Sequence, residues 1–224
     1  MCRFKSGLIL KDRVVVAQGS DDSHSILLEQ LNIKDSTMNA MTKFVRAELI
    51  PPNGEWWTDP EGWKFHIDQD IRPDWFNEDA GKYEERFRDA VKEWWKVHVL
   101  VDQKIDELRE GYYRLKRCEV KKLLNDVKAM LDNSTVQKML GNSTVQEMLG
   151  NSTVQEMWDN STVQEMWDNS TVQKMWGNST VQEMWDNSTV QKMCGNSIAR
   201  SNKDRKVYIA DGCGFEVVRK KNAE

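Results

Sequence analysis

From Val127 to Ile198 the chain reads VKAMLDNST VQKMLGNST VQEMLGNST VQEMWDNST VQEMWDNST VQKMWGNST VQEMWDNST VQKMCGNSI. These are eight consecutive units of nine residues without an insertion or a deletion, and a shortened unit, VKKLLND, precedes them at Val120–Asp126. A fixed short period is typical of repeat proteins in which each unit contacts only its neighbours. The period therefore predicts a stacked architecture for this half of the chain.

The same repeat distinguishes strands from helices. Nine residues turn an α-helix by about 900°, so equivalent side chains of successive units would lie on opposite sides of the helix. Asn, Ser, Thr and Val are also poor helix formers. Short strands separated by Gly-Asn or Asp-Asn turns agree better with the pattern.

The spacing of packed sheets sets the number of units in a coil. Two sheets pack about 10 Å apart and a strand rises about 3.3 Å per residue, so the two crossings of a coil use roughly six residues. A coil of one unit would leave almost nothing for strands, whereas two units leave about six residues per strand. We expect an α+β N-terminal domain followed by a two-sheeted parallel β-solenoid, with two nonapeptides per coil and about four coils.

Within a unit, Ser, Val and Met are expected to point inward and Thr and Gln outward. Val and Met are three residues apart, so strict alternation must break near the Glu or Lys position. The turn asparagines can adopt left-handed backbone conformations and bond to their equivalents on the next coil; they are Asn133, Asn142, Asn151, Asn160, Asn169, Asn178 and Asn187. Their Asn-Ser-Thr triplets are also glycosylation sequons, but the lack of a signal peptide favours the ladder.

The repeats also supply the candidate binding residues. Stacking places Trp158 above Trp176 on one side and Trp167 above Trp185 on the other, and these ladders either bind a ligand or belong to the core. Glu147, Glu165 and Glu183 form one acidic column, which either meets a cationic partner or is simply solvated. The other face carries Lys138, Glu156, Lys174 and Lys192.

Residues 1–116 are expected to form the small α+β domain, followed by the solenoid over 117–198 and a capping hairpin with a basic tail over 199–224. The expected elements of the first domain are a hairpin in LILKDRVVVA, a helix over Ser23–Leu31, strands in KFVRAELI and WKFHIDQDI, a helix over residues 79–99 and a second helical piece over Val101–Glu110. Its aromatic residues from Trp56 to Phe76 form either a Trp-rich core or a binding surface.

Composition limits the classes of function. The net charge of −4 does not favour a nucleic-acid partner, although it does not exclude one. The chain has no apolar run long enough for a membrane span, so we expect no membrane association and a cytoplasmic location. The four cysteines and the histidines His24, His66 and His98 lack metal-ligand spacing, so we expect free thiols, no metal site and no cofactor.

The only catalytic candidate is Cys2. After removal of Met1 it would be an N-terminal cysteine whose own amine could act as the base. In Met1-Cys2 alone, the chain resembles SRAP-type proteins and glutamine amidotransferases, which begin Met-Cys-Gly, but Arg3 replaces the glycine. An N-terminal-nucleophile enzyme with a solenoid handle is therefore the alternative hypothesis.

The nonapeptide Asn-Ser-Thr-Val-Gln-Glu-Met-Trp-Asp resembles tandem tracts at the C-terminal ends of uncharacterised bacteriophage and prophage proteins. The segments MCRFKSGLILKDRVVV and DDSHSILLEQL are similar to the N-terminal part of some of the same proteins. This resemblance implies a phage origin and a bacterial host cytoplasm, but it implies no activity.

Our preferred hypothesis is a non-enzymatic binding or assembly protein that uses its solenoid faces. The expected partner is a host protein or a small ligand, such as a defence enzyme or signalling molecule, and the solenoid ends could also join in a homodimer. A third hypothesis, ice binding, rests on the regular Thr135, Thr144 and Thr153 and is weakened by the bulky Trp and Met between them.

Overall fold

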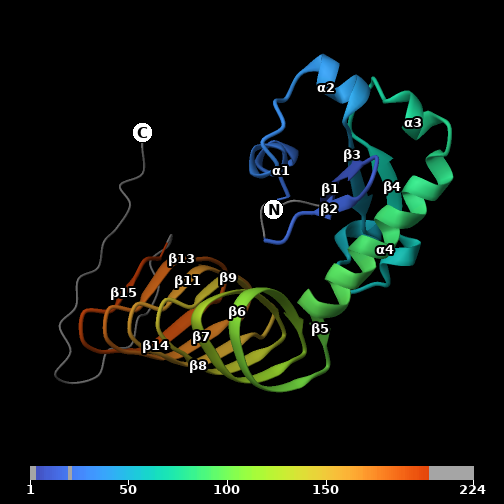
Figure 1. Ribbon diagram of the computed structural model, residues 1–224. Coiled ribbons are helices and arrows are strands. Elements are labelled where there is room, and N and C mark those ends of the chain that lie inside the picture. The colour runs from blue at the N-terminus through green and yellow to red at the C-terminus, as the bar shows by residue number, and fades with distance from the viewer. Residues whose placement is uncertain (1–3, 20–21, 202–224) are drawn as a thin grey trace, which may run out of the picture. The chain divides into compact units, whose positions relative to one another are not determined.

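The computed structural model describes residues 4–19 and 22–201, and the chain divides into two compact units between His98 and Val99 (Figure 1). We had expected this boundary at residue 116. The segment from Val99 to Lys116 instead pairs with the solenoid sheet, so it belongs to the solenoid.

The N-terminal unit is an α+β domain built on a four-stranded antiparallel sheet in the order β2-β1-β3-β4. Its strands are β1 (Lys5–Leu10), β2 (Val14–Val16), β3 (Phe44–Ile50) and β4 (Lys64–Ile67). Its helices are α1 (His24–Gln30), α2 (Thr37–Thr42), α3 (Asp74–Asn77) and α4 (Ala80–His98), with short 3-10 turns at Pro52–Gly54 and Pro60–Gly62. The expected hairpin, both strands and the long helix are confirmed, and the helix over Ser23–Leu31 is present as α1.

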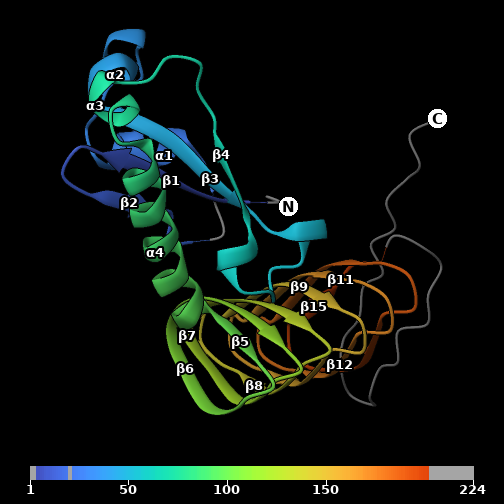
Figure 2. The ribbon, with the colours of Figure 1, turned by 90° about the vertical axis from the view of Figure 1, so that its right-hand side faces the viewer.

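Both faces of this sheet are covered. Leu8 and Phe44 pack with α1 and α2 on one face, whereas α4 lies along the other (Figure 2). The close approach of α4 depends on Gly7, because a Cβ atom there would lie 2.7 Å from the Phe87 ring. The resulting three-layer arrangement buries every residue of β1.

The aromatic stretch of this unit lies partly in the core, whereas Trp57, Phe65 and Trp75 are half-buried. Trp56, Trp63 and Phe76 are almost fully buried, and the rings of Trp56 and Trp63 meet edge to face at 5.4 Å. Aromatic pairs of this geometry stabilise a small core beyond the area that they bury.

The second unit is the parallel β-solenoid, drawn in Figure 1 as a stack of coils. Its strands are β5 (Val99–Val101), β6 (Lys104–Lys116), β7 (Glu119–Asp132), β8 (Thr135–Met139), β9 (Thr144–Leu149), β10 (Thr153–Met157), β11 (Thr162–Met166), β12 (Thr171–Met175), β13 (Thr180–Met184), β14 (Thr189–Met193) and β15 (Ile198–Ala199). Thr153 pairs with Thr171, and Thr162 pairs with Thr180. Each coil of the repeat therefore holds two nonapeptides, as the sequence predicts.

The solenoid has about six turns rather than four, because it begins before the regular repeat. Lys104 pairs with Glu119, which pairs with Thr135, so these first coils advance by 15 and 16 residues instead of 18. The helix expected over Val101–Glu110 is wrong, since this segment lies mostly in β6. Ile105 and Leu108 are three residues apart, as Val and Met are in each repeat unit. Because the same spacing is close to one helical turn, the sequence pattern also fits a helix.

The inward residues are those predicted. The repeat Val and Met side chains are buried, and so are the serines from Ser134 to Ser188. The pairing register runs through Thr153, Val154, Glu156 and Met157, and passes over Gln155. Alternation therefore breaks between Gln and Glu, which turns Met into the core.

The asparagine ladder between the turns is confirmed, but the expected left-handed backbone of its asparagines is mostly absent. Asn178 Nδ2 donates to Asn160 Oδ1 at 3.2 Å, and Asn196 continues the ladder at 3.3 Å. Asn133 is left-handed as expected (φ 49°), but in the later turns the left-handed residue is the preceding Asp or Gly, such as Asp159 (φ 56°) and Gly177 (φ 65°). Glycine and aspartate tolerate this conformation better than most residues do, so the ladder is free to use Asn side chains in ordinary backbone geometry.

Candidate functional site

The solenoid presents two long faces of different charge. We call the outward side chains of β9, β11 and β13, together with the adjoining Trp167 and Trp185, the acidic face. We call the outward side chains of β8, β10, β12 and β14 the mixed-charge face. The candidate binding residues of the sequence are divided between these two surfaces.

On the mixed-charge face, cations flank the single glutamate of the regular repeat. Glu156 lies 3.7 Å from the Lys138 ammonium on the preceding coil and 3.7 Å from that of Lys174 on the following coil. The register of the strands produces this arrangement, because Glu156 pairs with a lysine on each side. This column already neutralises its own carboxylate.

On the acidic face, like charges follow one another. Glu165 pairs in register with Glu147 on one side and with Glu183 on the other, at the strand spacing of about 4.8 Å. Burial raises the pKa of Glu147, and the neighbouring Glu165 carboxylate raises it further, whereas Arg114 acts in the opposite direction. A cation brought to this column would relieve the repulsion.

The repeat tryptophans directly follow the strands, at the start of the turns, and they form two stacks. The rings of Trp158 and Trp176 are 5.5 Å apart, and those of Trp167 and Trp185 are 5.1 Å apart. Trp167 Nε1 donates a hydrogen bond to Glu165 at 2.9 Å, which ties this stack to the acidic column. Trp158 is 36% exposed and the others are half-buried, so the indoles offer edges and part of a face rather than a free aromatic surface.

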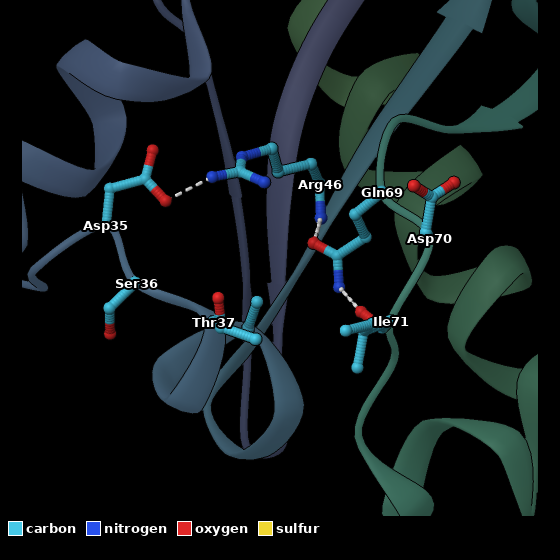
Figure 3. Close-up of a pocket in the computed structure, with 8 residues that line it drawn as sticks. Asp35, Ser36, Thr37, Arg46, Gln69, Asp70 and Ile71 are labelled. Atoms are coloured by element: carbon cyan, nitrogen blue, oxygen red, sulfur yellow. Dashed lines mark hydrogen bonds and ion pairs between the residues drawn. The ribbon is translucent and has the colours of Figure 1, made fainter.

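The N-terminal unit contains an open pocket of about 430 Å³, lined by residues that include Ser36, Thr37 and Asp70 (Figure 3). The Arg46 guanidinium points toward Asp35 and is paired with it. Gln69 accepts a hydrogen bond from the Arg46 backbone at 2.9 Å and donates one to the Ile71 carbonyl at 2.8 Å. The Arg46 and Gln69 side chains are therefore already engaged within the pocket wall.

A second polar group of this unit combines three potential metal ligands. The ligand atoms of His24, Glu48 and Asp68 lie within 4.8 Å of one another. Burial raises the pKa of Glu48 to about 7, with Asp68 and Asp22 adding to the effect. Burial also lowers the pKa of His24, against the opposing hydrogen bond to Ala47. No sequence spacing predicts this group, because its members lie in three segments of the chain that are 20 or more residues apart.

The structure brings the binding candidates of the sequence together only in part. Glu147, Glu165 and Glu183 share one face with Trp167 and Trp185, whereas Trp158 and Trp176 adjoin the mixed-charge face. Cys118 and Cys194 are free, buried thiols, and burial raises the pKa of Cys118, which disfavours the reactive thiolate. Cys2 and almost all of the expected C-terminal hairpin lie outside the described residues.

In the part of the chain that the structure describes, no helix has the length and apolar character needed to cross a membrane. Comparison of the chain with protein-family models, with curated proteins and with solved structures found no match.

Proposed function

We propose that this protein is a non-enzymatic binding protein whose acidic face holds a cationic segment of a partner protein. The observation that carries the proposal is the in-register column of Glu147, Glu165 and Glu183. Like charges on adjacent strands destabilise a sheet slightly, and a bound row of Lys or Arg side chains would convert that cost into attraction.

The stacked indoles support the same class of partner. Trp167 and Trp185 adjoin the acidic column, and indole faces attract ammonium and guanidinium groups. The other stack of this protein has such a contact, since the Lys192 ammonium lies 5.9 Å from the centre of a Trp176 ring. A basic peptide segment is therefore favoured over a nucleic acid, whose phosphates the acidic face would repel.

The contrast between the two faces supports specificity. Glu156 already has a lysine 3.7 Å away on each side, so the mixed-charge face gains less from a basic partner. The acidic face is consequently the proposed site, and the other face serves as an internal control.

The resemblance of the nonapeptide to phage and prophage tracts supports a phage-encoded protein that acts in the bacterial host cytoplasm, and hence a host protein, including a defence component, as the partner. Self-association through the solenoid ends is part of the same proposal, because the edge strands of a parallel sheet can pair with other strands.

The test is a titration of a fluorescent oligo-arginine peptide against the full chain at low and moderate salt. We expect binding that weakens as salt rises and at least tenfold weaker binding when Glu147, Glu165 and Glu183 are all changed to Gln. The matched control changes Lys138, Glu156 and Lys174 to Gln on the other face and should leave the affinity within about threefold. Equal losses in both variants, or no binding by the unaltered protein, would reject the acidic face as the site.

A further inference from the structure

The cluster of His24, Glu48 and Asp68 is assembled by three separate elements of the N-terminal unit. His24 is the first residue of α1 and Glu48 lies in β3. Asp68 directly follows β4, and its backbone N–H donates to the Arg46 carbonyl at 3.0 Å, which continues the ladder between β3 and β4. Since Glu48 pairs with His66, residues 48, 66 and 68 share one face of the sheet.

The hydrogen bond of His24 determines which ring nitrogen faces the carboxylates. His24 Nε2 lies 3.3 Å from the Ala47 carbonyl oxygen, and a carbonyl can only accept, so Nε2 carries the hydrogen. In the neutral ring Nδ1 then presents a lone pair, and it lies 3.4 Å from Asp68 Oδ2. Two electron-pair donors thus face each other, and a proton or a metal ion between them would replace this repulsion with attraction.

Glu48 supplies a second, independent observation. The residue is only 7% exposed, and within residues 4–19 and 22–201 its carboxylate has no hydrogen-bond or ion-pair partner. The nearby charges that act on it are the carboxylates of Asp68 and Asp22. Asp22 is itself engaged by the buried Lys5 ammonium at 2.8 Å, so the Glu48 carboxylate is aimed at the cluster without compensation. A buried carboxylate normally has a partner or coordinates a metal.

The separation of His24 Nδ1 and Asp68 Oδ2 fits a small divalent cation, and a ligand atom of Glu48 lies within 4.8 Å of both residues. Ligand atoms about 2.1 Å from a tetrahedral metal ion are about 3.4 Å apart, the separation found between His24 Nδ1 and Asp68 Oδ2. The hydrogen bond from Nε2 to the Ala47 carbonyl is the outer contact that orients most metal-binding histidines. The Asp68 side chain is 57% exposed, which leaves a path for the ion and room for water ligands.

We propose that His24 Nδ1 and the carboxylates of Glu48 and Asp68 bind one divalent transition-metal ion, of the Zn²⁺ or Mn²⁺ type. One imidazole nitrogen and two carboxylate oxygens suit these ions better than Ca²⁺, which prefers an all-oxygen shell. The site is independent of the acidic face of the solenoid, so either proposal can fail without the other.

The experiment uses the untagged full chain after dialysis against a chelator. Calorimetric titration with MnCl₂ and with ZnCl₂ should each give one bound ion, and CaCl₂ should bind at least tenfold more weakly. Mn²⁺ also avoids interference from thiols, which it binds poorly. At a hundred times the dissociation constant, the ion should raise the melting temperature of this unit by on the order of 10 °C.

Three variants test the ligands: His24→Asn, Glu48→Gln and Asp68→Asn. Each should weaken Mn²⁺ binding at least tenfold and abolish the metal-dependent rise in melting temperature. Asp70→Asn, which removes an exposed carboxylate two residues from Asp68, is the matched control and should bind normally.

Glu48→Gln should also melt at a higher temperature than the metal-free parent, because it removes a buried charge, so a failure to fold would not explain its lost binding. Unchanged Mn²⁺ affinity in Glu48→Gln, or no saturable binding of either ion by the parent protein, would overturn the proposal and leave a proton as the group that bridges the cluster.

Discussion

The indoles of Trp167 and Trp185 stack with their ring centres 5.1 Å apart and their planes 9° from parallel. The two residues are 18 positions apart and follow the paired strands β11 and β13, so the coil length itself sets their overlap. A ladder of stacked side chains is the structural consequence of a repeat without insertions.

This stack should contribute measurably to stability. In a double-mutant cycle of Trp167→Ser and Trp185→Ser, followed by urea denaturation, we expect a coupling energy of about 0.5–1.5 kcal/mol, the range for aromatic pairs. Trp167 and Trp176 belong to different stacks and should give a coupling near zero. A coupling as large between that control pair would show that the effect spreads through the coil and does not come from ring contact.

Replacing the central glutamate of the acidic column should stabilise the protein. Glu165→Gln removes a like charge next to Glu147 and Glu183, and the expected gain at pH 7 is about 0.2–1 kcal/mol in the free energy of unfolding. The pKa of Glu147 is raised in the folded protein, so folding favours its protonated form. The cost of the charged column is therefore absent below the unfolded-state pKa and appears as pH rises through the folded-state pKa.

The gain from Glu165→Gln should accordingly be largest near neutral pH and vanish in acid, as measured by urea denaturation across the pH range. Glu156→Gln is the control with the opposite sign, because Lys138 and Lys174 each lie 3.7 Å from that carboxylate. If Glu165→Gln and Glu156→Gln both raised the free energy of unfolding, glutamine would simply be favoured at this position of the repeat, and charge repulsion would not be the cause.

Two buried serines at equivalent positions of adjacent coils, Ser152 and Ser170, should differ in how much stability the protein loses when each is changed to alanine. Ser152 donates to the Leu149 carbonyl at 2.6 Å and accepts a hydrogen bond from the Ser134 N–H at 3.3 Å. The equally buried Ser170 hydroxyl has no hydrogen-bond partner among the described residues. Ser152→Ala should lower the free energy of unfolding by about 1–2 kcal/mol, and Ser170→Ala should leave it unchanged or raise it by up to about 1 kcal/mol. Similar losses at both positions would show that Ser170 also has a hydrogen-bond partner.

Gly177 tests the left-handed turn position. Its φ is +65°, and a Cβ atom there would lie 3.1 Å from the Asp159 carbonyl oxygen, so Gly177→Ala should cost about 1–2 kcal/mol. Gly177→Asp should cost less, because at the equivalent position Asp159 keeps φ +56° and accepts a hydrogen bond from the Gly141 N–H at 3.0 Å. Thermal melts of the two variants should rank them in this order, and the reverse order would show that the side-chain hydrogen bond contributes nothing.

The repeat alone predicted much of the solenoid. The period of nine, the chemistry of Gly-Asn and Asp-Asn turns and the distance between packed sheets gave the two-unit coil, the inward Ser, Val and Met and the asparagine ladder. These follow from local geometry that is repeated, so one unit carries the information for all of them. The sequence could not locate the start of the solenoid, because Ile105 and Leu108 have the spacing of both a helical turn and a repeat unit.

The tertiary structure decided what lies far apart in the chain. Because β6 pairs with β7, the solenoid begins directly after His98. The sequence does not reveal this start, since the first coils have 15 and 16 residues and so lack the 18-residue period of the repeat. The tertiary structure also brings together His24, Glu48 and Asp68, which follow no regular spacing in the sequence. A periodic sequence specifies contacts between equivalent residues at a fixed separation. Contacts between a helix and two strands depend on how the elements pack, and only the folded chain provides that arrangement.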